Sequence, residues 1–383
     1  MFRKVFLFGL ILIAIFCIGG FGGVFFEHSL LPRLAASRLF SRLAWVKNAS
    51  ENITIINKTE QVTIREDDSV EQVVSQPGTA VVKIIIRREA SRVVRTGAIS
   101  EDTATTGVLV TNDGVIATYR NATSFPDSKY LVLLGNGQSY DATLIGSDPL
   151  TNLVFLRIPA DNLPAISFAN SDDARVGKKL VAIGNASMEN QNRFSIGILE
   201  KKDRTFSLSG KTVASSEKWE GVFSIDLRSP GEYVGGPVVQ WDGEMAGILG
   251  VISFDNEKKY FVIPSNVVRS ALDAALRDSF ISRPILGAYY VSLTEGYALA
   301  HDTNQDEGAL IHSPSGKTSL AVLAGSPAEQ AGLLAGDIVT RVNGRGITLD
   351  YPLSRAISEF SKGSVAEITV LRGSEEKDLS VQL

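Results

Sequence analysis

The sequence predicts a mostly β protein of two folded domains, behind an apolar N-terminal segment and a polar linker. Between about residues 69 and 263, short apolar runs alternate with turns rich in Gly, Asn and Asp, which is typical of β-barrels. After a helix-like run, a second group of apolar runs and turn residues extends to Leu383. The 383 residues, 44% of them hydrophobic and 21% charged, suffice for two or three folded domains.

The N-terminal segment has the length and polarity of a membrane span. From Val5 to Phe26 it carries no charge, over roughly the 20 residues that cross a bilayer. Because Arg3 and Lys4 precede it, we expect residues 1–27 to form a cytoplasmic tip and a single-pass signal anchor in the cytoplasmic (inner) membrane, with the folded domains outside. A cleaved signal peptide is the alternative. Cys17, the one cysteine, lies in this segment, so the chain has no disulfide framework.

Residues 28–68 are expected to be a membrane-proximal stalk or linker. Their first part mixes basic and apolar residues, which suits either a basic amphipathic helix at the membrane surface or a plain spacer. Further on, Val62 and Ile64 alternate with polar residues, which indicates a short strand or an extended connection to the folded body.

The folded body is predicted to be built mainly from short strands. A helix should follow them at Ser265–Arg277, because Pro264 stands just before it and Ser265 is a plausible N-cap. The expected strands are Leu131–Leu134, Ala142–Ile145, Leu153–Ile158, Leu180–Ile183, Ser195–Leu199, Val222–Ile225, Val238–Gln240 and Ala246–Val251.

Three segments carry recognisable chemistry. Gly107–Thr123 reads GVLVTNDGVIATYRNAT, Asp148–Ile158 reads DPLTNLVFLRI, and Ser229–Gly250 reads SPGEYVGGPVVQWDGEMAGILG. In this order they resemble the base, carboxylate and nucleophile segments of HtrA (Deg) type trypsin-like serine proteases. The resemblance covers roughly residues 70–383. It implies an opening helix near Ser69 and a trypsin-like double β-barrel over 69–278.

The three catalytic positions of that family are occupied by residues that cannot do its chemistry. The resemblance places Asn121 where the family has its base histidine, Asn152 where it has the orienting carboxylate, and Val234 where it has the nucleophilic serine. A hydrocarbon cannot attack a carbonyl, and an amide is neither base nor carboxylate. The predicted barrel region has no substitute imidazole, because the only histidines are His28, His301 and His312. A serine–lysine dyad remains an alternative.

The C-terminal part resembles the PDZ domain of the same family. Leu320–Gly346 reads LAVLAGSPAEQAGLLAGDIVTRVNGRG, and Arg283–Ala288 resembles the R-P-x-L-G-V entry to that domain, so we expect a PDZ domain over 279–383. Such a domain binds a peptide as an added strand and holds its terminal carboxylate with loop amides. The carboxylate loop would be Ile285, Leu286, Gly287 and Ala288. The helix Pro352–Phe360 would form the opposite wall, with Leu353 and Ile357 contributing to the groove.

Function is therefore expected to lie in peptide binding. The sequence predicts an inactive, membrane-anchored HtrA-like protein whose PDZ domain binds peptides or unfolded C-termini; an active endopeptidase with a non-standard site is the alternative. The resemblance implies a homotrimer, or a mixed oligomer with an active paralogue, and no cofactor or metal. A net charge of −4 without a basic patch argues against nucleic acid as a partner.

Overall fold

The computed structural model describes residues 66–88, 103–119, 128–185, 190–209, 213–254, 257–277, 283–301, 305–315 and 320–383. Among the residues in these ranges, no helix is both long and apolar enough to cross a membrane. The predicted anchor, Val5 to Phe26, and nearly all of the predicted stalk lie outside them. The anchor and the stalk therefore remain predictions.

The first barrel follows an opening helix, α4 (Glu66–Thr79), which starts three residues earlier than predicted. Six antiparallel strands close in the order β1-β2-β3-β6-β5-β4. All five side chains of β3 are buried, and four of them belong to the apolar core. The fifth, Thr118, is polar, and its hydroxyl donates to the Thr106 carbonyl oxygen over 2.6 Å. The strands are β1 (Val81–Arg88), β2 (Thr103–Leu109), β3 (Val115–Tyr119), β4 (Ser128–Leu133), β5 (Ser139–Ser147) and β6 (Leu153–Arg157).

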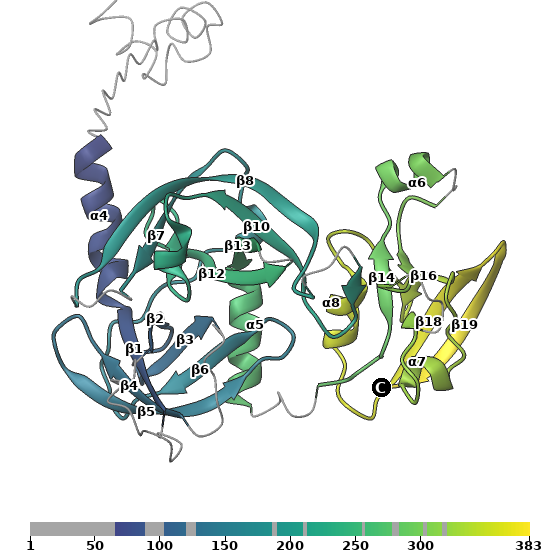
Figure 1. The fold of residues 1–383 in the computed structure, drawn as a ribbon, viewed down its shortest axis with the longest axis horizontal. Coiled ribbons are helices and arrows are strands. Elements are labelled where there is room, and N and C mark those ends of the chain that lie inside the picture. The colour runs from purple at the N-terminus through teal and green to yellow at the C-terminus, as the bar shows by residue number, and fades with distance from the viewer. Residues whose placement is uncertain are drawn as a thin grey trace, which may run out of the picture. The chain divides into compact units, whose positions relative to one another are not determined.

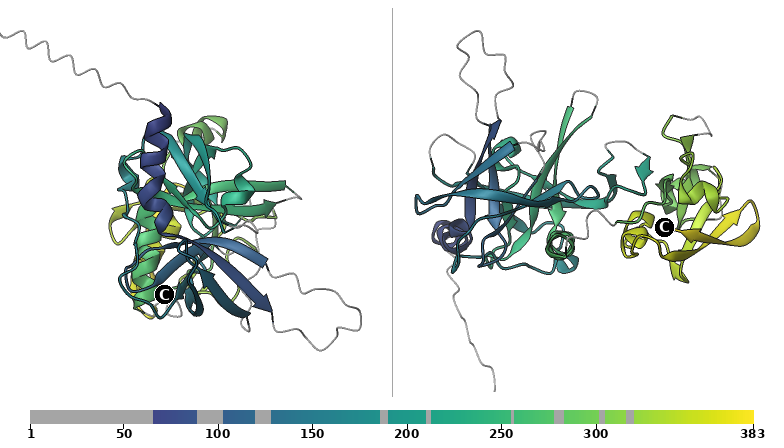
Figure 2. Two further views of the ribbon diagram at one scale, coloured as in Figure 1. Left: turned by 90° about the vertical axis from the view of Figure 1, so that its left-hand side faces the viewer. Right: turned by 90° about the horizontal axis from the view of Figure 1, so that it is seen from below.

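The second barrel closes in the order β10-β13-β12-β11-β7-β8 and shares one continuous apolar core with the first. Its strands are β7 (Lys179–Gly184), β8 (Arg193–Ser207), β10 (Glu220–Asp226), β11 (Pro237–Val239), β12 (Met245–Phe254) and β13 (Glu257–Pro264). Two short 3-10 turns, η2 (Ser171–Asp173) and η3 (Pro230–Tyr233), lie in its connections. Figure 1 shows the two barrels, and Figure 2 shows α4 and α5 (Ser265–Leu276) along one side of the pair.

A third sheet has a separate core. Its order is β19-β18-β16-β15-β14-β9, with β17 beside β16. Asn343 and Gly344 both have left-handed backbone (φ 47° and 74°) and form the predicted hairpin turn. The elements are β9 (Ala214–Ser215), β14 (Tyr289–Ser292), β15 (Ala309–Ile311), β16 (Ile338–Val342), β17 (Arg345–Gly346), β18 (Val365–Arg372), β19 (Glu375–Gln382), α6 (Glu295–His301), α7 (Pro327–Gln330) and α8 (Leu353–Ser358).

All eight strands expected from the sequence are present, several of them longer than predicted. Two predictions about helix ends were wrong. Pro264, not Ser265, is the N-cap of α5, and the Ser265 hydroxyl instead donates to the Ala169 carbonyl oxygen over 2.7 Å. Helix α8 is also shorter than Pro352–Phe360, because Pro352 has extended backbone and serves as its N-cap. The domain boundaries at 27, 68 and 278 remain predictions.

Candidate functional site

The loop at the predicted nucleophile position has an ordered shape and carries Val234 in place of a serine. It begins at Ser229, whose backbone is left-handed (φ 51°), and continues as η3. The amide of Glu232 donates to the Ser229 carbonyl oxygen over 3.1 Å, so the turn itself uses this donor. Val234 follows with only 6% of its surface exposed and belongs to the core shared by the barrels. The isopropyl group of Val234 therefore lies where the resemblance places the nucleophilic serine of the family.

The glycine after Val234 belongs to the intact half of the motif, and the backbone here requires it. Gly235 has a φ of 84°, and its amide donates to the Leu249 carbonyl oxygen over 2.8 Å. A Cβ there would lie against the Thr106 carbonyl oxygen and the Thr118 hydroxyl, too close for any side chain. The loop framework thus depends on Gly235.

Asn152, at the predicted carboxylate position, is held in place by three neighbours. Its backbone is left-handed (φ 61°), and its backbone N–H donates to the Asp148 carbonyl oxygen over 2.9 Å. Asn152 Nδ2 donates to the Tyr119 hydroxyl over 3.4 Å, and Asn152 Oδ1 accepts from Lys218 Nζ over 3.1 Å. The amide side chain thus bridges a phenol and an ammonium group. Asn121, at the predicted base position, lies outside the described residues.

The turn that carries Asn152 is organised by a fully buried carboxylate, Asp148. One of its oxygens accepts from the Leu150 amide over 3.1 Å, and the other accepts from the Thr151 hydroxyl over 2.7 Å. Arg283 forms an ion pair with it over 3.1 Å. Both oxygens of this carboxylate are bonded within the turn or to Arg283, which makes it a structural group.

The chemistry left around the predicted triad is weak. Burial raises the pKa of the Tyr119 phenol above its ordinary value, although the hydrogen bond from Asn152 opposes the shift, so this group stays neutral at pH 7. The ammonium of Lys218 donates to Asn152 and, over 2.6 Å, to the Pro149 carbonyl oxygen. In the part of the chain that the structure describes, no cluster of three or more His, Cys, Asp or Glu could hold a metal ion.

The predicted carboxylate loop of the PDZ domain is ordered, with its four residues in different environments. Ile285 is 56% exposed, whereas Leu286 and Ala288 are fully buried. Gly287 has a φ of 81°, and a Cβ there would lie against the side chain of Ser326, which caps α7. On α8, Leu353 and Ile357 are buried in the core of the third sheet.

Sequence reasoning missed the group that binds this loop. The Glu217 carboxylate accepts hydrogen bonds from the amides of Leu286 (3.2 Å) and Gly287 (2.8 Å). It comes from the connection between β8 and β10, where β9 pairs antiparallel with β14; Figure 1 shows the short teal β9 beside the green β14. Nothing in the sequence around Glu217 marks this contact, because its partners lie about 70 residues further along the chain.

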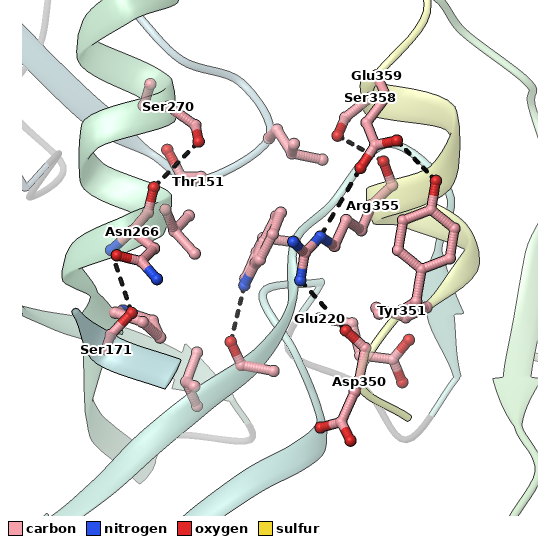
Figure 3. Close-up of a pocket in the computed structure, with 18 of the residues that line it drawn as sticks. Thr151, Ser171, Glu220, Asn266, Ser270, Asp350, Tyr351, Arg355, Ser358 and Glu359 are labelled. Carbon is pink, nitrogen blue, oxygen red and sulfur yellow. Dashed lines mark hydrogen bonds and ion pairs between the residues drawn. The ribbon is translucent and has the colours of Figure 1, made fainter. Parts of the chain in front are cut away.

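A second carboxylate, Glu220 at the start of β10, is buried against the third sheet. It accepts hydrogen bonds from the hydroxyls of Tyr290 (2.7 Å) and Ser292 (2.9 Å) on β14. Burial raises the pKa of Glu220 to about 7, although both hydrogen bonds oppose the shift. Glu220 lines a cavity of about 1160 Å³ that also includes residues of α5 and α8. Figure 3 shows Asn266 and Ser270 of α5 facing Arg355 and Glu359 across it.

Comparisons with known proteins agree with this architecture. A trypsin-like peptidase domain family matches residues 95–248, and a PDZ domain family matches residues 296–383. A protein of Rhizobium meliloti named "Probable periplasmic serine endoprotease DegP-like" is 28% identical over 72% of this chain and 52% of its own length. A protein of the same name from Halomonas elongata is 30% identical over 72% of this chain and 55% of its own length. The chain thus spans about half the length of these curated relatives.

Solved structures show the same fold at low identity. The HtrA-type protease AlgW with a tripeptide has a TM-score of 0.62 at 23% identity, covering 81% of this chain and 95% of its own. A serine endoprotease from Yersinia pestis has a TM-score of 0.53 at 23% identity, covering 82% of this chain and 96% of its own. With its trypsin-like barrels, its PDZ domain and its DegP-like relatives, the chain belongs to the HtrA-type family.

Proposed function

We propose that this HtrA-type chain has lost peptidase activity and acts by binding peptides or unfolded C-termini through its PDZ domain. The observation that carries the proposal is Val234, a buried hydrocarbon at the predicted nucleophile position, directly before the intact Gly235-Gly236-Pro237 half of the motif. Loss of triad members removes roughly four to six orders of magnitude of rate. A site with valine and two amides at those positions retains only binding and loop effects.

Peptide binding is supported by the third sheet and by its relatives. The loop Ile285–Ala288 presents backbone amides at the end of β14, which is where an added strand would place a carboxylate. Two structures of similar fold are described as AlgW with a decapeptide and AlgW with a tripeptide. Leu353 and Ile357 would contribute to the wall of the groove from beneath, since both are buried.

The location and assembly are further parts of the proposal. Curated relatives are named periplasmic, which fits folded domains outside the cytoplasmic membrane. Residues 5–26 would anchor the chain there. A homotrimer, or a mixed oligomer with an active paralogue, would bring several PDZ domains together.

Activity-based labelling tests the loss of catalysis. The purified full-length chain should neither react with a fluorophosphonate probe nor cleave casein, while an active serine protease run beside it should do both. Covalent labelling of one serine in the barrels, found by mass spectrometry, would show that the chain is an active enzyme.

An active endopeptidase is the second candidate, because the curated relatives are named serine endoproteases. Lys218 is the one observation near the predicted triad that favours it, since its ammonium contacts Asn152. A lysine base would have to reach a serine hydroxyl. If casein is cleaved, loss of cleavage in Lys218→Met would identify such a base.

A further inference from the structure

The segment Val213–Glu217, here named the docked segment, lies on the PDZ strand β14 as a peptide ligand would. Ala214 pairs with Tyr290 and Ser215 with Tyr289 in antiparallel register. The pairing continues at Ser216, whose amide donates to the Ala288 carbonyl oxygen over 3.0 Å. A strand added to an exposed sheet edge is how PDZ domains bind peptides.

The carboxylate of the docked segment lies where a peptide's terminal carboxylate would lie. Glu217 Oε1 accepts from the amides of Leu286 and Gly287, the middle of the predicted carboxylate loop. The hydroxyls of Ser215 and Ser216 also donate to this carboxylate, over 2.9 and 2.6 Å. Four donors therefore converge on one side chain. A side-chain carboxylate, one residue beyond the strand, thus takes the place of a chain end.

The docked segment is also packed, not merely hydrogen-bonded. Ala214 is 2% exposed and belongs to the core of the third sheet, together with Leu353 and Ile357 of α8. Ser216 is 3% exposed, and its hydroxyl oxygen accepts from the Ala288 amide over 3.1 Å. Small side chains are needed at both positions because each one faces closely packed groups.

We propose that the docked segment is an internal ligand of the PDZ groove, so that an external peptide binds only by displacing it. The matching external ligand is an extended peptide with small residues, followed by a carboxylate from its C-terminus or from an acidic side chain. The inference rests on the proposed peptide-binding function. Occupancy by the docked segment weakens the apparent affinity by the fraction of chains in which the groove is free.

Displacement of the docked segment would also affect the turn of the first barrel that carries Asn152. Lys218, directly after Glu217, donates to Asn152 Oδ1 at the predicted triad position, and the Trp219 amide donates to the Leu150 carbonyl oxygen over 2.9 Å. A peptide that removes Glu217 from the loop therefore pulls on the turn that carries Asn152. The docked segment is thus connected to the Asn152 turn through Lys218 and Trp219, which follow it directly in the chain.

The test uses the full-length chain and a fluorescent peptide, Thr-Val-Ala-Ser-Ser, with a free C-terminal carboxylate. This peptide copies residues 212–216 and ends where Glu217 begins. Glu217→Ala removes the internal carboxylate, and Ala214→Lys places a long side chain in the core position. Glu200→Ala, on an exposed part of β8, is the matched control. We expect the first two variants to bind the peptide at least about tenfold more tightly than the wild type and the control, as release of an occupied groove requires.

Hydrogen exchange at the Leu286 and Gly287 amides separates the two proposals. Without added peptide, these two amides should exchange faster in Glu217→Ala and in Ala214→Lys than in the wild type. The first variant lacks the carboxylate that accepts from them, and the second should release the segment that carries it. If exchange and affinity both match the wild type, the docked segment is no ligand and the inference is overturned. If exchange quickens but no variant binds peptide, the internal ligand stands and the proposed peptide-binding function fails.

A reversible lock gives an independent test. Ser215→Cys with Tyr289→Cys, in a Cys17→Ser background, places two cysteines at paired positions of adjacent strands. The oxidised variant should lose peptide binding, and dithiothreitol should restore it. Equal binding before and after reduction, with the disulfide confirmed by mass spectrometry, would overturn the inference.

Discussion

Lys218 Nζ lies 3.1 Å from Asn152 Oδ1, so an ammonium group is bonded to the residue at the predicted position of the orienting carboxylate. Asn152 also donates to Tyr119, and together these contacts hold an amide in a left-handed backbone conformation. An amide can serve both partners at once, because it has a donor and an acceptor. The position has therefore become part of a structural network.

Asn152 should be needed for stability more than for chemistry. Asn152→Ala puts alanine, which tolerates left-handed backbone less well than asparagine, at this position and removes both side-chain hydrogen bonds. We therefore expect a loss of about 2 kcal/mol in the free energy of unfolding. Asn152→Gly keeps the backbone conformation and should lose less. Urea unfolding of both variants measures the difference. An alanine variant as stable as the glycine variant would contradict the role of the backbone.

Val234→Ser alone should remain silent toward a fluorophosphonate probe. A serine hydroxyl without a base is a poor nucleophile, and Asn152 supplies no charge to orient one. The Glu232 amide is already bonded within η3, which further weakens any oxyanion site. Mass spectrometry of the labelled chain measures the outcome, with Val234→Ala as the matched control. Specific labelling at residue 234 would show that a base is present after all.

Stability should fall as the pH rises from about 4.5 to about 7. Glu220 has its pKa raised from 4.5 to about 7 in the folded protein, so the folded state holds an extra proton across this window. The stabilisation from protonated Glu220 is fully present below pH 4.5 and is lost as the pH rises through 7. It amounts to about 3 kcal/mol. Thermal unfolding at several pH values should show this slope in the wild type and a smaller one in Glu220→Gln. Identical slopes would contradict the assignment.

Asp148→Ala should destabilise the barrels strongly. The change removes the acceptor of the Leu150 amide and the Thr151 hydroxyl and leaves Arg283 without this partner. Breaking a buried, hydrogen-bonded ion pair costs about 3 kcal/mol. Asp161→Ala, at an exposed position, is the control and should change little. Urea midpoints of the two variants check this, and equal midpoints would show that Asp148 is not structural.

Gly287→Val should unfold part of the PDZ domain. A side chain at Gly287 would strike Ser326, whose hydroxyl accepts from the Glu329 amide over 3.2 Å at the start of α7. The left-handed backbone at Gly287 adds strain for valine. We expect a clear fall in melting temperature by circular dichroism. An unchanged melting temperature would show that the loop can shift to make room.

The sequence predicted most of the barrel strands because each is a short apolar run, three to six residues long, between turn residues. Gly235 and Gly236 also placed Val234 at the predicted nucleophile position, and that assignment remains a prediction. Strand β9 was not predictable, since two residues, Ala214 and Ser215, carry no periodicity and pair only with a distant strand. The role of Glu217 depends on that pairing, so local patterns contain no trace of it.

The burial of Glu220 was missed for a related reason. Glu220 stands at the start of a strand, where a charged residue is usually exposed, yet Tyr290 and Ser292 of the third sheet cover it. Sequence patterns rank a glutamate as exposed, because an unpaired buried carboxylate is rare. Only the contact between the second barrel and β14 reveals the exception.

One measurement tests directly whether the chain binds peptide without cleaving it. A fluorescent Thr-Val-Ala-Ser-Ser peptide with a free carboxylate is mixed with the full-length Glu217→Ala variant, and its polarisation is followed for several hours. The account predicts a rise to a constant value, with the peptide's mass unchanged at the end. A rise that decays, together with cleavage fragments in the mass spectrum, would contradict the loss of catalysis, and no rise at all would contradict peptide binding.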